Sequence, residues 1–170
     1  MFIQQTDLFR GMDKDFVKKT YDLTVKQSFA EGEVLFTEGD QASHFYILLK
    51  GRIRLGTRDT GQVVHTVSRP GEAFGWSSLV GRDIYSASAE CVQPTTLLKI
   101  DRKDFQEIFE KDPINGLSFF RRLAGALGER LINSYGSLGL AHTSEEHRTY
   151  GSSLTLQQSG SEITERTKGP

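Results

Sequence analysis

The 170-residue sequence contains a single cysteine, Cys91, so it cannot form an internal disulfide. A lone cysteine is typical of a protein kept in a reducing compartment. The sequence also lacks an apolar run approaching the ~20 residues that a membrane span needs. Its N-terminal segment, MFIQQTDLFRGMDKD, lacks the basic stretch and apolar core of a signal peptide. These absences predict a soluble cytoplasmic protein.

The sequence also has no excess of positive or negative charge, since its formal net charge at pH 7 is −1. Bulk electrostatics therefore favour neither nucleic acid nor an anionic membrane as a partner. The sequence contains no G-x-S-x-G motif, no Walker loop and no carboxylate pair with a supporting pattern. Its four histidines are dispersed without metal-ligand spacing. We expect no enzyme activity, no metal site and no required cofactor.

Between residues 27 and 100, short apolar runs alternate with turn signals. The runs are SFAEGEVLF, FYILLKGRIRLG, QVVHTVS, SASAECV and TTLLKI, and the turns include Glu31-Gly32, Glu38-Gly39-Asp40, Asp59-Thr60-Gly61, Arg69-Pro70-Gly71 and Gln93-Pro94. Many short strands at this spacing predict an antiparallel sandwich or barrel. Cys91 is expected to pack inside it, whereas Lys50, Arg52 and Arg54 alternate as on a solvated face.

Helical periodicity flanks this block on both sides. Residues 6–26 indicate one or two short helices with an aspartate as N-cap. Asp101 can cap a helix that begins after the last apolar run, and Asp112-Pro113 is typical of a second helix start. That second helix is predicted over 113–138 and would be about 39 Å long at 1.5 Å per residue.

Apolar residues recur in the 113–138 helix at steps of three and four. They are Leu117, Phe120, Ala124, Leu127, Leu131 and Leu138, with Ser134 as a polar member of the same seam. The helix either packs wholly on its own sheet or presents part of this seam to a second copy. We favour the second interpretation, a homodimer, because a regular heptad stripe is what paired helices require.

Residues 139–170 are rich in Ser, Thr, Gly, Gln and charge, without a clear period. This composition predicts a polar flexible tail. The tail is too short and too polar for a second folded domain.

The segment PGEAFGWSSLVGRDIYSASAE, residues 70–90, has the pattern of a phosphate-binding turn. Gly71 and Gly75 can turn the chain sharply, and residues 76–79 can follow as one helical turn with free N–H groups. Ser77 and Ser78 suit a helix start and can add hydroxyl donors. A cyclic phosphate diester needs such donors together with a cation and an acceptor for the ribose hydroxyl.

With these residues the chain resembles the cyclic nucleotide-binding domain family, found in the bacterial catabolite activator and in regulatory subunits of protein kinase A. The resemblance covers roughly residues 6–138. It rests on FAEGEVLFTEGD (29–40), FYILLKGRI (45–53) and PGEAFG (70–75), then on DRKDF and the long helix. It implies a mainly β fold, an antiparallel β-roll or jelly roll with N-terminal helices and a long C-terminal helix. The implied ligand is a cyclic nucleotide, cAMP or cGMP.

Catabolite-activator-like regulators continue past the long helix into a helix-turn-helix domain, and no such pattern follows here. The resemblance therefore implies a stand-alone module, and we expect no direct DNA binding.

The family's phosphate-binding cassette typically reads F-G-E-x-A-L, followed later by R-A-A or R-S-A. Here Phe74-Gly75, Leu79 and Ser86-Ala87 match, but Trp76 stands at the ribose-binding glutamate position and Tyr85 at the phosphate-binding arginine position. An indole only donates, and a phenol is neutral at pH 7. Two missing charge-assisted hydrogen bonds, at about 1.5–3 kcal/mol each, predict an affinity lower by two to four orders of magnitude.

Three further possibilities follow from this pattern. Arg82 could swing inward as a substitute cation, although a solvated loop arginine is the commoner case. Trp76 and Tyr85 could line a pocket for another ring-shaped ligand, or simply fill a vestigial pocket. The resemblance also aligns Ser134 with a long-helix hydroxyl that contacts adenine, although a serine in a seam is more often a register device. The candidate ligand contacts are Gly75, Trp76, Ser77, Ser78, Leu79, Arg82, Tyr85, Ser86, Ala87 and Ser134.

The sequence thus predicts a regulatory or sensing module that couples occupancy of a pocket at residues 71–87 to the geometry of the long helix. Cyclic nucleotides would bind it weakly, another ligand would bind, or none would. The alternative is a ligand-free protein–protein interaction module that binds an unknown partner through the heptad helix and the tail.

Overall fold

The computed structural model describes residue 3, residues 6–58 and residues 60–152, with side chains described as far as residue 135. The chain divides into two units, residues 1–124 and residues 125–170, and the boundary falls inside the last helix. All strands of the described residues belong to the first unit.

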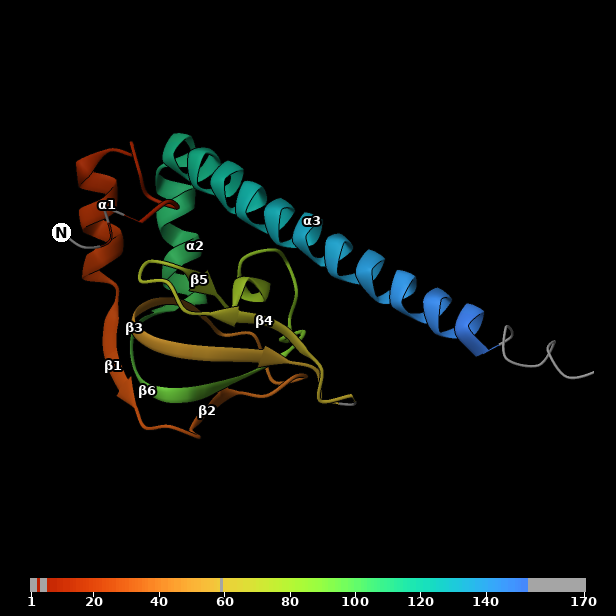
Figure 1. Ribbon diagram of the computed structural model, residues 1–170. Helices are drawn as coiled ribbons and strands as arrows, with labels where there is room; N and C mark the ends of the chain where they lie inside the picture. Colours follow the sequence, from red (N-terminus) through yellow and green to blue (C-terminus); the bar gives the residue numbers. More distant parts are fainter. Residues whose placement is uncertain (1–2, 4–5, 59, 153–170) are drawn as a thin grey trace, which may run out of the picture. The chain divides into compact units, whose positions relative to one another are not determined.

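A six-stranded antiparallel sheet forms the first unit's framework (Figure 1). Its strands are β1 (Val25–Phe29), β2 (Val34–Phe36), β3 (His44–Gly56), β4 (Val63–Val67), β5 (Ala73–Phe74) and β6 (Ser88–Asp101). The hydrogen-bonded order is β1-β6-β3-β4, with β2 paired to β6 and β5 to β3. The long strands β3 and β6 pair from end to end. The predicted mainly β, antiparallel architecture is confirmed.

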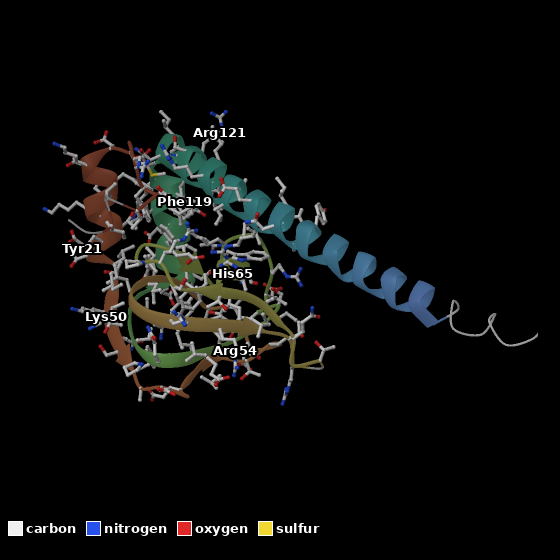
Figure 2. All side chains as sticks on the ribbon, viewed as in Figure 1. Tyr21, Lys50, Arg54, His65, Phe119 and Arg121 are labelled. Carbon is white, nitrogen blue, oxygen red and sulfur yellow. The ribbon has the colours of Figure 1, made fainter. Side chains whose placement is uncertain are left out.

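The second half of β3 alternates between surface and interior as predicted. Lys50, Arg52 and Arg54 on β3 are exposed, and Figure 2 labels the first and last of them. Between them Ile53 points inward opposite Cys91, and both are fully buried. The cysteine therefore acts as a small apolar core residue, as expected.

Pro94 lies within β6, so the turn predicted at this position is wrong. Proline lacks an N–H and is tolerated in a sheet where the ladder is interrupted. The β3–β6 register shifts here, at Gly51, which has φ +111°. A Cβ on that glycine would lie 2.6 Å from Thr95 Cα. The irregular pairing therefore accommodates the proline, and β6 continues as one strand.

Three helices accompany the sheet: α1 (Lys14–Asp22), α2 (Arg102–Lys111) and α3 (Pro113–Ser152). Asp101 caps α2 by accepting hydrogen bonds from the N–H groups of Lys103 at 2.8 Å and Asp104 at 3.4 Å. Asp112 Oδ1 accepts a hydrogen bond from the Asn115 N–H at 3.1 Å in the first turn of α3. Both predicted helix starts are confirmed.

Helix α3 extends further than the sequence pattern predicted. The sequence predicted a helix over 113–138 followed by a polar flexible tail, whereas the helix continues to Ser152, so the predicted end of the helix is wrong. No proline interrupts the chain between Pro113 and Pro170, and a polar composition alone does not end a helix. The remainder of the predicted tail, residues 153–170, lies outside the described residues.

A cluster of phenylalanines fixes the helices of the first unit to the sheet. Phe119, at the start of α3, is fully buried. Its ring centroid lies 5.3 Å from that of Phe9, 6.0 Å from Phe45, 5.2 Å from Phe105 and 5.1 Å from Phe109. Helices α1 and α2 lie side by side (Figure 1). The beginning of α3 is therefore part of the same core as β3 and α2.

Candidate ligand-binding site

The cassette, residues 71–87, contains β5, the short 3-10 helix η2 (Trp76–Ser78) and a loop. Gly75 precedes η2 and has φ +74°. A Cβ on Gly75 would lie 2.9 Å from Tyr46 Cδ2 and 3.0 Å from His44 O. Only glycine permits both this backbone conformation and this close approach. The structure thus has the glycine turn and the helical turn that the sequence predicted.

The two serines of η2 are directed inward. Ser77 is 3% exposed and Ser78 is fully buried. Both the Ser78 hydroxyl and the Ser78 N–H donate hydrogen bonds to Gly75 O, at 2.9 and 3.2 Å. Ser78 therefore stabilises the turn with donors that were candidates for ligand contacts.

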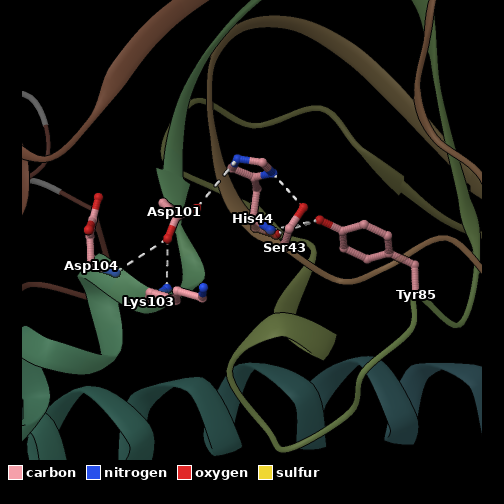
Figure 3. A network of polar contacts seen from close by, with 6 residues as sticks. All are labelled: Ser43, His44, Tyr85, Asp101, Lys103 and Asp104. Atoms are coloured by element: carbon pink, nitrogen blue, oxygen red, sulfur yellow. Dashed lines mark hydrogen bonds and ion pairs between the residues drawn. The ribbon is translucent and has the colours of Figure 1, made fainter.

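Tyr85, at the other end of the cassette, is 3% exposed. Its ring stacks on Phe36 with a centroid distance of 3.7 Å and an interplanar angle of 17°. Its hydroxyl donates to His44 O at 2.8 Å and accepts a hydrogen bond from the His44 N–H at 3.0 Å. Figure 3 shows the tyrosine side chain extending toward His44, beside Ser43. The tyrosine is thus packed and hydrogen-bonded within the domain.

Two more rings extend this stack into the interior of the sheet. Tyr46 lies 5.5 Å from Phe36 and 5.1 Å from Phe74, centroid to centroid. All three rings, and that of Tyr85, belong to one buried apolar cluster. The space behind the cassette is therefore part of an aromatic core.

Burial also sets the charge state of the tyrosines. It raises the pKa of Tyr85 above its ordinary value, against hydrogen bonds with His44, Tyr46 and Ser43 that lower it. The pKa of Tyr46 is raised as well, by burial and then by the neighbouring Tyr85. Both phenols are neutral at physiological pH, so neither supplies a charge to the cassette.

The other candidate contacts divide between the interior and the surface. Leu79 is buried, and Trp76 and Ala87 are partly buried. Arg82 and Ser86 are exposed, and the Arg82 carbonyl accepts a hydrogen bond from Arg102 Nη1 at 3.1 Å. The Arg82 side chain therefore lies on the surface, and its contact with a ligand remains a prediction.

Next to the cassette, His44 connects β3 to the start of α2 (Figure 3). Its Nδ1 lies 2.8 Å from Ser43 Oγ, and its Nε2 lies 3.9 Å from Asp101 Oδ2. Burial lowers the pKa of His44, Lys99 lowers it further, and Asp101 opposes both. The imidazole is therefore mostly neutral at physiological pH, and its contact with Asp101 is not an ion pair there.

Sequence reasoning missed one polar contact of the cassette. His65 Nε2 on β4 lies 2.7 Å from Glu72 Oε1, and the Glu72 side chain is 9% exposed. The N–H groups of Ser68 and Arg69 donate to Glu72 Oε2 at 3.2 and 3.3 Å. Burial raises the pKa of Glu72, but these hydrogen bonds outweigh it and lower the pKa to about 2. The carboxylate therefore fastens the start of the cassette to β4.

The depressed pKa of Glu72 predicts a pH dependence of stability. The stabilisation of the fold by the ionised Glu72 carboxylate should be complete above the ordinary glutamate pKa of 4.5 and should be lost as the pH falls through about 2. We expect Glu72→Gln to lower the free energy of unfolding at pH 7 by roughly 2–3 kcal/mol and to flatten its decline below pH 4.5. Urea denaturation at a series of pH values measures this effect. Glu107→Gln, at an exposed carboxylate, is the matched control, and equal pH curves for both variants would contradict the assignment.

The candidate interface residues of α3 lie in two environments. Phe120 packs on Phe109 at 4.9 Å within the first unit, and Leu117 and Ala124 are exposed. In the second unit Leu127 is partly buried and Leu131 is exposed. The side chain of Leu138 lies outside the described residues. Contacts of these residues with a second copy remain a prediction.

Ser134, proposed from the resemblance as an adenine contact, is exposed in the second unit. Its hydroxyl donates to Leu131 O at 2.7 Å within the helix. Contact between this hydroxyl and a ligand remains a prediction.

Two kinds of site are absent from the part of the chain that the structure describes. No cluster of three or more histidine, cysteine, aspartate or glutamate residues there could hold a metal ion. No helix there combines the length and apolar character needed to cross a membrane.

This antiparallel sheet, in which the turn at Gly75 leads into the 3-10 helix η2, has the fold of cyclic nucleotide-binding β-roll domains, a class of regulatory module. The model of the cyclic nucleotide-binding domain family matches residues 26–112, just over half of the chain, and the chain belongs to this family.

Known proteins similar to this chain include receptors and kinases. The cyclic AMP receptor protein of Thermus thermophilus is 29% identical over 73% of this chain and 56% of its own length. Human cGMP-dependent protein kinase 2 is 27% identical over 62% of this chain and 14% of its own length. The chain therefore spans about half of the bacterial receptor and a small part of the kinase.

Solved structures agree with this membership. A protein from Geobacter metallireducens GS-15, described as a candidate cyclic nucleotide-binding protein, has a TM-score of 0.66 and 27% identity, and the match covers 73% of this chain and 91% of that one. The Thermus thermophilus catabolite activator protein has a TM-score of 0.64 and 28% identity, covering 81% of this chain and 63% of that one.

Proposed function

We propose that this chain is a regulatory module in which aromatic packing replaces the two charged ligand contacts of the family's cassette. Cyclic AMP and cyclic GMP then bind weakly or not at all. The observation that carries this proposal is the environment of Tyr85. The ring is buried against Phe36, and its hydroxyl is paired with both backbone groups of His44.

A tyrosine at this position differs from an arginine in charge and in available donors. A guanidinium offers five N–H donors and a permanent positive charge to a phosphate. Tyr85 has one O–H donor, and that donor is already engaged at His44 O. A cyclic phosphate would therefore meet a neutral, occupied hydroxyl where the resemblance expects a cation.

Trp76 stands at the position of the second charged contact, the glutamate that binds the ribose in the family's cassette. A glutamate accepts hydrogen bonds from ribose hydroxyl groups, whereas an indole has a single N–H donor and no acceptor. Trp76 is partly buried directly after Gly75, so its bulk occupies the position from which a carboxylate would reach the ribose. Together the two substitutions support an affinity reduced by about two to four orders of magnitude.

A thermal-shift series tests this proposal on the intact chain. A ligand present at 100 times its Kd stabilises a protein by about 2.7 kcal/mol, which shifts the melting temperature of a domain this size by several degrees. We expect no shift with cAMP or cGMP at millimolar concentration, and none with AMP as the matched non-cyclic control. A shift of several degrees with either cyclic nucleotide would refute the proposal.

We further propose that the module acts through α3, which pairs with the same helix of a second copy in a homodimer. Within the second unit, Leu131, Ile132 and Tyr135 are 52%, 68% and 59% exposed. Neighbouring apolar side chains exposed along a helix are typical of a surface that another helix covers. Leu127, Leu131 and Leu138 follow the heptad spacing of such a contact.

A charge placed in this seam should separate the subunits. Leu131→Glu is expected to convert a dimer to monomers, because two buried carboxylates would face each other across the interface. Asn133→Glu is the matched control, since residues two apart on a helix do not share a face. Light scattering after gel filtration measures the mass. A monomeric wild-type chain would overturn the homodimer and would favour a different protein as the partner of α3.

A further inference from the structure

Backbone hydrogen bonds fasten the loop at residues 79–87 to residues 39–42 at several points. The Tyr85 N–H donates to Asp40 O at 2.9 Å, and Tyr85 O accepts from the Gly39 N–H at 3.0 Å. Further along, Asp83 O accepts a hydrogen bond from the Ala42 N–H at 2.8 Å. The loop therefore runs beside residues 39–42 as a short antiparallel pair.

The Tyr85 side chain adds a contact of a different kind. Its hydroxyl both donates to and accepts from the backbone of His44. A Cβ on Gly75 would lie 3.0 Å from the same His44 oxygen. One phenol thus connects the end of the loop with His44 of β3, the residue that Gly75 approaches closely.

The same loop also touches the start of α2. Arg102 Nη1 donates to Arg82 O at 3.1 Å, and the Arg102 N–H donates to Ser43 O at 2.9 Å. Asp101, one residue earlier, caps α2. The loop and Ser43 therefore both contact Arg102, the first residue of α2.

We propose that Tyr85 is an internal latch: its hydroxyl, bonded to the His44 backbone, keeps the 79–87 loop closed on residues 39–44 whether or not a nucleotide is present. This inference rests on the proposed function and adds a fixed conformation to it. A ligand shifts a conformational equilibrium only through different affinities for its two states. A side chain of the same molecule is always present, so the latched cassette holds α2 in one arrangement independently of ligand concentration.

Amide hydrogen exchange on the full-length chain tests the latch. Tyr85→Phe keeps the ring and removes only the hydroxyl, and a buried hydrogen bond of this kind corresponds to a change of roughly two- to tenfold in the opening equilibrium. We expect exchange to accelerate by about that factor in residues 79–87 and 39–42, with β3 and β6 unchanged. Tyr21→Phe, at an exposed tyrosine of α1, is the matched control.

Any of three results would overturn the latch alone. The first is equal exchange in Tyr85→Phe, Tyr21→Phe and the wild type, and the second is an acceleration in Tyr85→Phe that is spread evenly over all strands. The third is a wild-type loop that exchanges as fast as an unstructured peptide, and this measurement does not depend on the folding of any variant. Calorimetric titration of the wild type with cAMP separates the two proposals: tight binding refutes the proposed function, whereas absent binding with an unaffected Tyr85→Phe loop refutes only the latch.

Discussion

Replacing Trp76 with Glu and Tyr85 with Arg in the same chain is expected to raise its affinity for cAMP by about two to four orders of magnitude. The double variant restores an acceptor for the ribose hydroxyl and a cation for the phosphate, on a cassette whose glycine turn and 3-10 helix are already in place. Without ligand it should be less stable than the wild type, because the arginine loses the stack on Phe36 and the bonds to His44. Isothermal titration calorimetry measures the gain.

The control for this experiment is the pair Trp76→Gln and Tyr85→Gln, which removes both rings without adding charge. It should bind no better than the wild type, since charge-assisted hydrogen bonds supply the expected gain. If the folded Glu and Arg variant gained no affinity over this control, the assignment of Trp76 and Tyr85 to the two anchor positions would be wrong.

Phe119→Ala is expected to lower the free energy of unfolding by about 3–5 kcal/mol, the usual range for a fully buried phenylalanine. Its ring contacts four other phenylalanines that come from β3, α2 and the N-terminal segment. The substitution therefore opens a cavity where the helices meet the sheet. Urea denaturation of the full chain measures the loss.

Phe120→Ala is the matched control on the same turn of α3. Phe120 is only partly buried and contacts Phe109 and Phe119. Its truncation should cost clearly less than that of Phe119. Equal losses for the two variants would contradict the packing described for the start of α3.

Most of the fold could be predicted because each turn and helix start is marked by residues that lie close together in the sequence. Glycine turns separate the strands of the roll, and Asp101 and Asp112 mark the helix starts through contacts within three residues. The turn predicted at Pro94 was wrong, because β6 continues through this residue. It can do so because Gly51 on the neighbouring strand, more than forty residues away in the sequence, permits a register shift between β3 and β6. The end of α3 was misplaced because polar residues without a proline do not stop a helix.

The candidate site could be located from sequence, but the contacts of its side chains could not. The resemblance to the family's cassette implied that Trp76 and Tyr85 are the two departures, and their place in a ligand site remains a prediction. The partner of each side chain depends on long-range packing: the sequence does not reveal that the Tyr85 ring meets Phe36 or that its hydroxyl meets His44. The contact of His65 with Glu72 was missed for the same reason. The acidic residue directly after Gly71 was the one sign in the sequence that pointed to a polar contact here.

The proposed latch and the proposed loss of nucleotide dependence both follow from the contacts of Tyr85. If Tyr85 holds the loop closed from within, the module no longer needs a phosphate to bring the cassette and the start of α2 together. The double variant Trp76→Glu, Tyr85→Arg should then behave oppositely, with a loop that is open without nucleotide and closed with it.

The most direct measurement is a calorimetric titration of the wild-type chain with cAMP and with cGMP. Aromatic replacement of both charged contacts predicts no saturable heat at nucleotide concentrations up to about 1 mM, corresponding to a binding free energy weaker than about −4 kcal/mol. Saturable binding of either cyclic nucleotide with a Kd in the micromolar range would contradict it.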